Sequence, residues 1–328
     1  MSPDPILVVA MQVAGVESDY RALTERCGLL DRSERGKLAL SGRDAASFLQ
    51  GQVTNDVERL VEGEGCYAAF LTPKGKMLGD LRVLCTVDEL LLDTERVALQ
   101  GLFNMIRRFS IGYDAELHKR TLERGLLTLI GPDVDRIVGT DQLPATEHSH
   151  RPIMIDGIEA RAIRTDSGID LLCLAAETEN LRSDLAARGA VHVSEEAAEC
   201  VRIEGGRPLY GVDLDETVIP QEAGLNERAV SFTKGCYVGQ ETVARLHYRG
   251  KPNRHLRGLR LSAPYPPGSE LLLGDRMVGR LTSVVESPRF GPIGLALVRR
   301  EAAPGVTLVP KGEDGTAEVV ALPFIPTA

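Results

Sequence analysis

The stretch Lys234-Gly235-Cys236-Tyr237-Val238-Gly239-Gln240-Glu241 places a single cysteine in a turn between two glycines. A helix is predicted directly after it, from Gln240 to Leu246. A neighbouring cation and a helix N-terminus both favour the thiolate, which is the reactive form of cysteine. Cys236 is therefore a candidate functional thiol, with Lys234 as the cation beside it. Alternatively, Cys236 is a small buried apolar residue, as most free cysteines are.

The chain immediately downstream is strongly basic. Between Arg245 and Arg260 there are five arginines, one lysine and two histidines, and no acidic residue. This segment is either a solvated strand and linker or an anion site for a polyglutamate tail, a phosphate or an acidic partner. The whole chain has a net charge of −9, which argues against nonspecific binding of nucleic acid.

Length and composition indicate a globular protein of two or three domains. The chain has 328 residues, of which 43% are hydrophobic and 26% are charged. No apolar run approaches the roughly 20 residues that cross a bilayer. The apolar run Ile6 to Met11 is short, and Asp4 stands where a signal peptide would be positively charged. We expect a cytoplasmic protein that does not enter a membrane.

The six cysteines are dispersed and form no metal-binding pattern. They show no C-x-x-C spacing, so neither a zinc site nor a permanently bound cluster has a readable ligand set, and no metal ligand is predicted. Dispersed cysteines fit reduced thiols in a reducing compartment. If the protein serves iron–sulfur clusters, we do not expect it to carry one permanently.

The first 250 residues mix strands and helices without a βαβ rhythm, which predicts an α+β fold with antiparallel sheets. Asp44 is expected to cap the helix that begins at residue 45, and Ser194 the helix that begins at residue 195. The predicted helices cover residues 45–51, 95–109, 178–188 and 195–203. The predicted strands cover residues 37–40, 67–71, 80–87, 89–93, 126–130 and 169–175. A turn at 72–75 joins two of these strands, with Gly75 able to adopt a positive φ.

The pattern of predicted secondary structure changes after Gly250-Lys251-Pro252-Asn253. Short strands separated by Pro and Gly follow, which predicts a small β-barrel. The expected strands cover residues 255–262, 270–273, 277–285, 293–298, 306–309 and 316–322. We therefore divide the chain into a mixed region, residues 1–250, and a C-terminal barrel domain, residues 251–328. No glycine-rich motif for a dinucleotide or a nucleotide phosphate is present.

The string KGCYVGQE at 234–241, followed by Thr242 to Arg245, resembles the signature of the YgfZ family. These are folate-binding proteins of iron–sulfur cluster assembly and repair, related to the glycine-cleavage T-protein, an aminomethyltransferase. Residues 40–57, 67–84 and 202–225 resemble further blocks of the two families. The resemblance implies two interleaved α+β subdomains and a C-terminal small β-barrel around a central folate channel.

The resemblance also implies ligand-binding residues for tetrahydrofolate or a derivative. A carboxylate suits the paired N–H donors of the pterin edge, and arginine suits the glutamate tail. Asp80 aligns with an aspartate that acts near the reactive folate nitrogens in T-proteins. Asp170 aligns with the pterin-binding carboxylate, although it is shorter than the family's Glu. Asn55 and Gln240 are expected amide contacts, and Arg245 is the expected partner of the tail. Alternatively, Asp80 is a solvated turn residue, and the others brace loops.

Three functions follow from these residues. The leading hypothesis is a tetrahydrofolate-binding accessory protein for iron–sulfur clusters, in which Cys236, Asp80 and Lys234 are the working residues. Its partners would be folate and iron–sulfur client or assembly proteins. The second is an aminomethyltransferase of the glycine-cleavage type, so enzymatic activity is left open; T-proteins lack Cys236. The third is an interaction module that binds RNA or an acidic partner through residues 245–260, which a steep salt dependence of binding would reveal.

Overall fold

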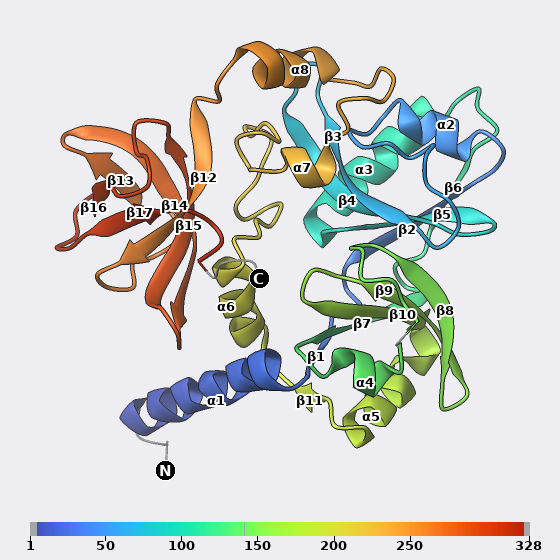
Figure 1. The fold of residues 1–328 in the computed structure, drawn as a ribbon, viewed down its shortest axis with the longest axis horizontal. Helices are drawn as coiled ribbons and strands as arrows, with labels where there is room; N and C mark the ends of the chain where they lie inside the picture. Colours follow the sequence, from blue (N-terminus) through green and yellow to red (C-terminus); the bar gives the residue numbers. More distant parts are fainter. Residues whose placement is uncertain (1–4, 141, 325–328) are drawn as a thin grey trace.

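The computed structural model describes residues 5–140 and 142–324, with side chains from residue 15 onward. The described strands form two open sheets and one closed barrel, as Figure 1 shows. The open sheets are largely antiparallel, and helices lie between and around them. The predicted fold class, α+β with a C-terminal β-barrel, is confirmed.

The first sheet is five-stranded and antiparallel, and it contains the predicted strands of residues 37–94. Helix α3 (Arg96–Phe109) buries Leu99, Leu102 and Ile106 against this sheet, because these residues recur at helical spacing. Helix α2 (Ala45–Gln50) buries Phe48 and Leu49. In spatial order, the strands are β3 (Gly65–Leu71), β4 (Met77–Cys85), β5 (Glu89–Thr94), β2 (Gly36–Ser41) and β6 (Glu116–Lys119).

The second sheet has six strands, and it takes its second strand from the start of the chain. Strand β1 precedes β2 in sequence but pairs with β7 and β11, so the two subdomains are interleaved. Helices α4 (Val134–Val138) and α5 (Thr178–Ala187) cover it, with a short 3-10 turn at Ala175–Glu177. In spatial order, the strands are β11 (Val191–His192), β1 (Gly28–Asp31), β7 (Arg124–Ile130), β10 (Gly168–Leu174), β9 (Ile158–Arg164) and β8 (His150–Ile155).

The C-terminal strands close into a six-stranded barrel with its own apolar core. Each expected barrel strand is present, and β14 is longer than expected. Helix α6 (Glu195–Glu204) packs against β14, and helix α1 (Pro5–Glu25) packs against α6. In chain order, the barrel strands are β12 (Arg254–Leu261), β13 (Glu270–Leu273), β14 (Arg276–Ser287), β15 (Gly291–Arg299), β16 (Thr307–Pro310) and β17 (Ala317–Val320).

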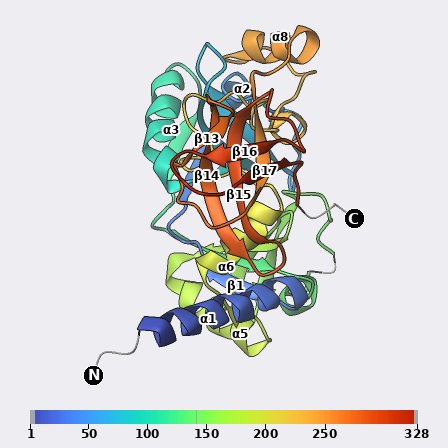
Figure 2. The same cartoon turned by 90° about the vertical axis from the view of Figure 1, so that its left-hand side faces the viewer.

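The segment between α6 and the barrel connects all three units. It contains the short helix α7 (Asn226–Ala229) and helix α8 (Gln240–Arg249). The carboxylate of Asp213 in this segment accepts hydrogen bonds from Thr282 (2.5 Å) and Ser283 (2.7 Å) of β14. Both views place α8 and α1 at opposite ends of the molecule (Figures 1 and 2).

Some local expectations are confirmed, and others need correction. Asp44 does not cap α2; its carboxylate accepts instead from the backbone N–H of Asp114, at 2.9 Å. Ser194 does cap α6, since its side chain accepts from Ala197 N. Gly75 adopts a φ of 75°, as expected for its turn. Helix α8 continues to Arg249, beyond the expected end at Leu246, and strands β1, β8 and β9 and helix α1 were not expected.

The apolar run at residues 6–11 falls within α1. The side chains of this run, and Asp4 before it, lie outside the described part of the chain. None of the described helices is both long enough and apolar enough to cross a membrane.

Candidate functional site

A cavity of about 470 Å³ lies between the two open sheets, and α6 with the segment after it forms a further wall. Tyr67 and Asp80 enter from the first sheet, and Thr128 and Asp170 enter from the second. Every arginine of the lining is paired with an acid. The charged lining residues are Arg32, Arg35, Arg82, Arg202, Arg207 and Arg228, with Asp80, Asp93, Glu95, Glu147, Asp166 and Asp170.

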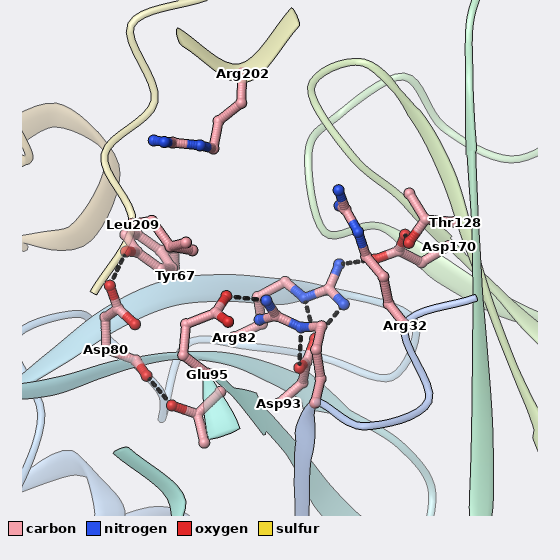
Figure 3. A network of polar contacts seen from close by, with 12 residues as sticks. Arg32, Tyr67, Asp80, Arg82, Asp93, Glu95, Thr128, Asp170, Arg202 and Leu209 are labelled. Atoms are coloured by element: carbon pink, nitrogen blue, oxygen red, sulfur yellow. Dashed lines mark hydrogen bonds and ion pairs between the residues drawn. The ribbon is translucent and has the colours of Figure 1, made fainter. Parts of the chain in front are cut away.

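A buried ionic network forms the floor of this cavity, shown in Figure 3. Arg82 Nε donates to Asp93 Oδ2 at 2.7 Å, and its Nη1 lies 2.6 Å from Asp170 Oδ2. Arg35 Nε donates to the other oxygen of Asp93 at 2.9 Å. Thr128 Oγ1 donates to Asp170 Oδ1 at 2.7 Å, so both oxygens of Asp170 are engaged. Arg82 therefore ties the first sheet to the second through Asp170, while Asp93 holds it within the first sheet.

The acidity of Asp93 reflects this pairing. Burial alone would raise the pKa of Asp93, but the charges of Arg35 and Arg82 and their hydrogen bonds outweigh burial and lower it to about 2. Asp93 therefore keeps its charge throughout the physiological pH range. Removing one partner of a buried pair leaves an uncompensated charge, at a cost of about 3–5 kcal/mol.

Asp80 differs from the other floor carboxylates because it has no cation of its own. It is buried on β4, and Tyr67 Oη donates to its Oδ2 at 2.5 Å. Among residues 15–140 and 142–324, Tyr67 is the only residue whose side chain donates a hydrogen bond to this carboxylate. Burial raises the pKa of Asp80 to about 6, although the Tyr67 hydrogen bond works in the opposite direction. A carboxyl group with such a pKa can both accept and release a proton near neutrality.

The rim of the cavity carries more exposed ion pairs. Arg228 on α7 binds Glu147 at 2.5 Å, and its guanidinium lies 5.2 Å from the ring centroid of Tyr67. Arg207 Nε lies 2.5 Å from Asp166 Oδ2, and each side chain is about one-third exposed, at 32% and 31%. Solvent-exposed pairs typically contribute only about 0.2–1 kcal/mol. The rim pairs can therefore exchange partners at little cost, whereas the floor pairs cannot.

Cys236 lies outside this cavity, on the loop 231–239 that precedes α8, here called the thiol loop. Cys236 is exposed, whereas each of the other five cysteines is buried or half-buried. The alternative of a small buried apolar residue is therefore wrong. Gly239 has a φ of 86°, and a Cβ there would lie 2.6 Å from the carbonyl oxygen of Thr72. The loop thus packs on the β3–β4 turn at a position that only glycine fits.

Lys234 holds the thiol loop against the segment that follows α2. Its Nζ donates to the carbonyl oxygens of Gln50 (2.6 Å), Val53 (2.7 Å) and Asn55 (2.7 Å). Burial lowers the pKa of Lys234 to about 8, and the charge of Asp56 opposes this shift. The observed contacts make Lys234 a clamp on three carbonyls. An effect of its charge on the Cys236 thiol stays a prediction.

Asn55 connects this clamp to the cavity. Its Nδ2 donates to the carbonyl oxygens of Tyr67 (2.9 Å) and Arg228 (3.2 Å), the two residues whose side chains stack at the cavity wall. Gln240 is half-buried at the start of α8, and Arg245 is exposed on the same helix. Neither they nor Asn55, Lys234 and Cys236 are among the lining residues of the cavity. Of the predicted site residues, the structure brings together Asp80 and Asp170.

Comparison with known proteins decides the family. Residues 10–234 match the GCVT N-terminal domain, and residues 254–325 match the glycine cleavage T-protein C-terminal barrel domain. The chain belongs to the glycine cleavage T-protein family. The match to the barrel domain begins at Arg254, which is also the first residue of β12.

Relatives within this family carry transferase names. The chain is 31% identical over 309 residues to a protein of Arabidopsis thaliana named as a chloroplastic transferase, covering 90% of this chain and 71% of the relative. It is 30% identical over 325 residues to an aminomethyltransferase of Rubrobacter xylanophilus, covering 96% and 87%. The crystal structure of aminomethyltransferase T from Bartonella henselae superposes with a TM-score of 0.85 at 22% identity, covering 94% of this chain and 89% of that one. This likeness shows a shared fold.

Sequence reasoning missed much of this cavity. Tyr67, Arg82 and Asp93 lie within predicted strands, but they were not recognised as site residues. One signal was present: Asp80 and Arg82 alternate along one strand, so they share a face of the sheet. A charged residue inside the apolar run Leu81 to Leu84 also requires a buried partner. Arg228 and Glu147 gave no comparable signal, because they meet from segments 81 residues apart.

Metal chemistry has no preformed site in the described part of the chain. No group of three or more His, Cys, Asp and Glu side chains there is arranged to hold a metal ion.

Proposed function

We propose that this protein binds tetrahydrofolate or a derivative in the central cavity and serves as an accessory protein in iron–sulfur cluster assembly or repair. The thiol of Cys236 would be its working group, and iron–sulfur client or assembly proteins its partners. One observation carries this proposal: an exposed thiol sits on a loop that Lys234 and Asn55 fasten to the wall of a cavity containing a buried carboxylate.

The cavity suits a folate in size and polarity. Its volume of about 470 Å³ lies within the roughly 300–1,000 Å³ typical of small-molecule sites. Asp170 has both oxygens engaged by Arg82 and Thr128, whereas Asp80 keeps one oxygen without a side-chain donor among the described residues. Asp80 is therefore the better partner for the paired N–H groups of a pterin, since a carboxylate accepts them in a charge-assisted way. Bound folate would supply a carrier for one-carbon units.

The position of Cys236 suits contact with another protein. An exposed thiol outside the ligand cavity is accessible to a cluster-bearing partner. The KGCYVGQE string around it resembles the YgfZ signature, and Cys236 belongs to no group of three or more potential metal ligands in the described structure. We therefore assign Cys236 to transient contact with a cluster as cargo, in a protein of the cytoplasm. Neither nucleic acid nor membrane is a proposed partner.

An aminomethyltransferase is the second candidate function. The observation that favours it is the pKa of Asp80, which burial raises to about 6, in a family whose relatives include proteins named aminomethyltransferase. A group with this pKa can steer a proton near a reacting nitrogen. Such an enzyme should release methylene-tetrahydrofolate and ammonia from an aminomethyl-lipoyl carrier.

Three experiments test these proposals. An anaerobic titration with tetrahydrofolate should show binding to wild type and weakened binding to Asp80→Asn; no binding to wild type would contradict the folate assignment. Incubation with the aminomethyl-lipoyl carrier and tetrahydrofolate distinguishes the two functions, since only the aminomethyltransferase should yield free ammonia. In cells that lack the protein, wild type should restore a [4Fe–4S] enzyme after oxidative stress, and Cys236→Ser should not.

A further inference from the structure

The arginines around the cavity differ in how free they are to bind a ligand. Arg82 is one-tenth exposed and is held by two buried carboxylates, so it cannot leave them without stranding a charge. Arg32 is engaged at both Nε and Nη2 by Glu195. Arg207 binds Asp166 through Nε, and its two Nη groups make no hydrogen bond to the described residues. Both Nη groups of Arg207 are thus available to a ligand in the cavity.

The backbone of Arg207 is fixed although its side chain is half-exposed. Arg202 Nη1 donates to the carbonyl oxygen of Arg207 at 2.5 Å, and Arg207 N donates to the carbonyl oxygen of Arg202 at 3.1 Å. Arg202 is itself held by Asp213 at 2.8 Å. A guanidinium on a fixed backbone loses less freedom when it binds a ligand, which strengthens binding.

A second observation at the same place also indicates a ligand. The hydroxyl of Thr165, which lines the cavity beside Asp166, is buried and has no hydrogen-bond partner among the described residues. A buried hydroxyl without a partner costs free energy unless something in the cavity bonds to it. Ser167 lines the cavity on the other side of Asp166. The turn from Thr165 to Ser167 thus brings the carboxylate of Asp166 to Arg207, and Ser167 Oγ donates to that carboxylate at 3.3 Å.

We propose that Arg207 and the Thr165–Ser167 turn bind the carboxylate-bearing glutamate tail of the folate. In the ligand-free protein, Asp166 pairs with Arg207 in place of the ligand carboxylate. This inference rests on the proposed folate function and specifies the end of the ligand that the rim recognises. The two Nη groups of Arg207 match a carboxylate in the bidentate geometry that guanidinium favours. Arg245, the tail partner expected from the sequence, is exposed on α8 and is not part of the cavity lining.

The test compares two ligands that differ only in the tail. Binding of 5-formyltetrahydrofolate and of 5-formyltetrahydropteroate, which lacks the glutamate, is measured by calorimetry for wild type and for Arg207→Gln. Wild type should bind the glutamate-bearing ligand about tenfold more tightly, since one charge-assisted pair is worth about this factor. Arg207→Gln should lose this preference and bind 5-formyltetrahydropteroate as wild type does. A full preference retained in Arg207→Gln would overturn the assignment.

Two further variants sharpen the result. Asp166→Asn frees Arg207 from its internal partner, so it should bind the glutamate-bearing ligand several-fold more tightly; weaker binding would count against the exchange of carboxylates. Arg245→Gln removes a cation outside the cavity and should bind both ligands as wild type does. If neither ligand binds wild type, the proposed folate function falls and the tail site falls with it. If both bind with equal affinity, only the tail site is overturned.

Discussion

The cavity floor and the thiol loop each depend on one buried cation, but the charge of that cation is compensated differently in the two regions. Arg82 in the floor meets two carboxylates, so its charge is neutralised where it lies. Lys234 in the thiol loop meets three neutral carbonyls, and burial lowers its pKa to about 8. The floor is thus a permanent ionic joint between two sheets. Lys234 holds the thiol loop through hydrogen bonds to neutral groups, which suits the partner contact proposed for Cys236.

The largest expected effect comes from breaking the floor. Arg82→Met strands Asp93 and Asp170 as buried charges without this partner, so we expect the free energy of unfolding to fall by about 3–5 kcal/mol. Urea unfolding followed by circular dichroism measures it. Arg43→Met is the matched control, because Arg43 pairs with Asp114 on the surface and should be silent. Equal effects of the two variants would contradict the floor's role.

The second effect is a pH dependence that belongs to Asp80. Its pKa is raised on folding from 3.8 to about 6, so between these values the folded state binds more protons than the unfolded state. The contribution of Asp80 to stability should therefore fall as pH rises from about 4 to 6, by at most about 3 kcal/mol for such a shift.

Unfolding of wild type and Asp80→Asn at several pH values isolates this contribution. The difference in unfolding free energy between them should shift in favour of Asp80→Asn as pH rises through this window. If this difference does not change with pH, Asp80 does not have the raised pKa that burial without a paired cation should produce.

A smaller effect is expected from the clamp in the thiol loop. Lys234→Met leaves three carbonyl oxygens without their donor, and buried groups left unsatisfied cost about 1–3 kcal/mol. The loss should be smaller than for Arg82→Met, because no charge is stranded. The alkylation rate of Cys236 under native conditions should also change, since its loop is released. Mass spectrometry after brief iodoacetamide treatment measures this rate.

If the rate in Lys234→Met equals that in wild type, Lys234 does not position the thiol. The half-buried Cys85 serves as an internal reference in the same spectra.

The smallest effect on stability should come from Cys236→Ser. The side chain is exposed, and surface substitutions away from special features usually change stability by less than about 0.5 kcal/mol. A thermal scan should give the same midpoint as wild type, while 5-formyltetrahydrofolate binding also stays unchanged. A large drop in the midpoint would mean that the thiol is part of the packing after all.

Elements with strong local sequence patterns were predictable, whereas elements placed by contacts with distant segments were not. Helix α3 and the barrel strands have a clear hydrophobic period or clear turn residues, and local chemistry of this kind can be read along the chain. Strand β1 has four residues, and helix α1 acquires its place by packing on α6, β1 and β11, so local signals were too weak for them.

The candidate site was predictable only in part. Cys236, Asp80 and Asp170 stand out because a thiol or a carboxylate in such surroundings needs a reason. The pairing of Arg82 with Asp170 and of Arg228 with Glu147 arises from contacts between distant segments, which a single sequence does not reveal. Lys234 was singled out, but the direction of its side chain toward three carbonyls became visible only in the folded chain.

The most direct test uses cells that lack this protein, complemented with wild type, Cys236→Ser or Asp80→Asn. The readout is the activity of a [4Fe–4S] enzyme after oxidative stress, with glycine cleavage measured alongside. We expect wild type to restore the cluster enzyme and both variants to fail, although Cys236→Ser is stable and still binds the folate. Restoration of the cluster enzyme by Cys236→Ser, or restoration of glycine cleavage alone, would contradict the proposed function.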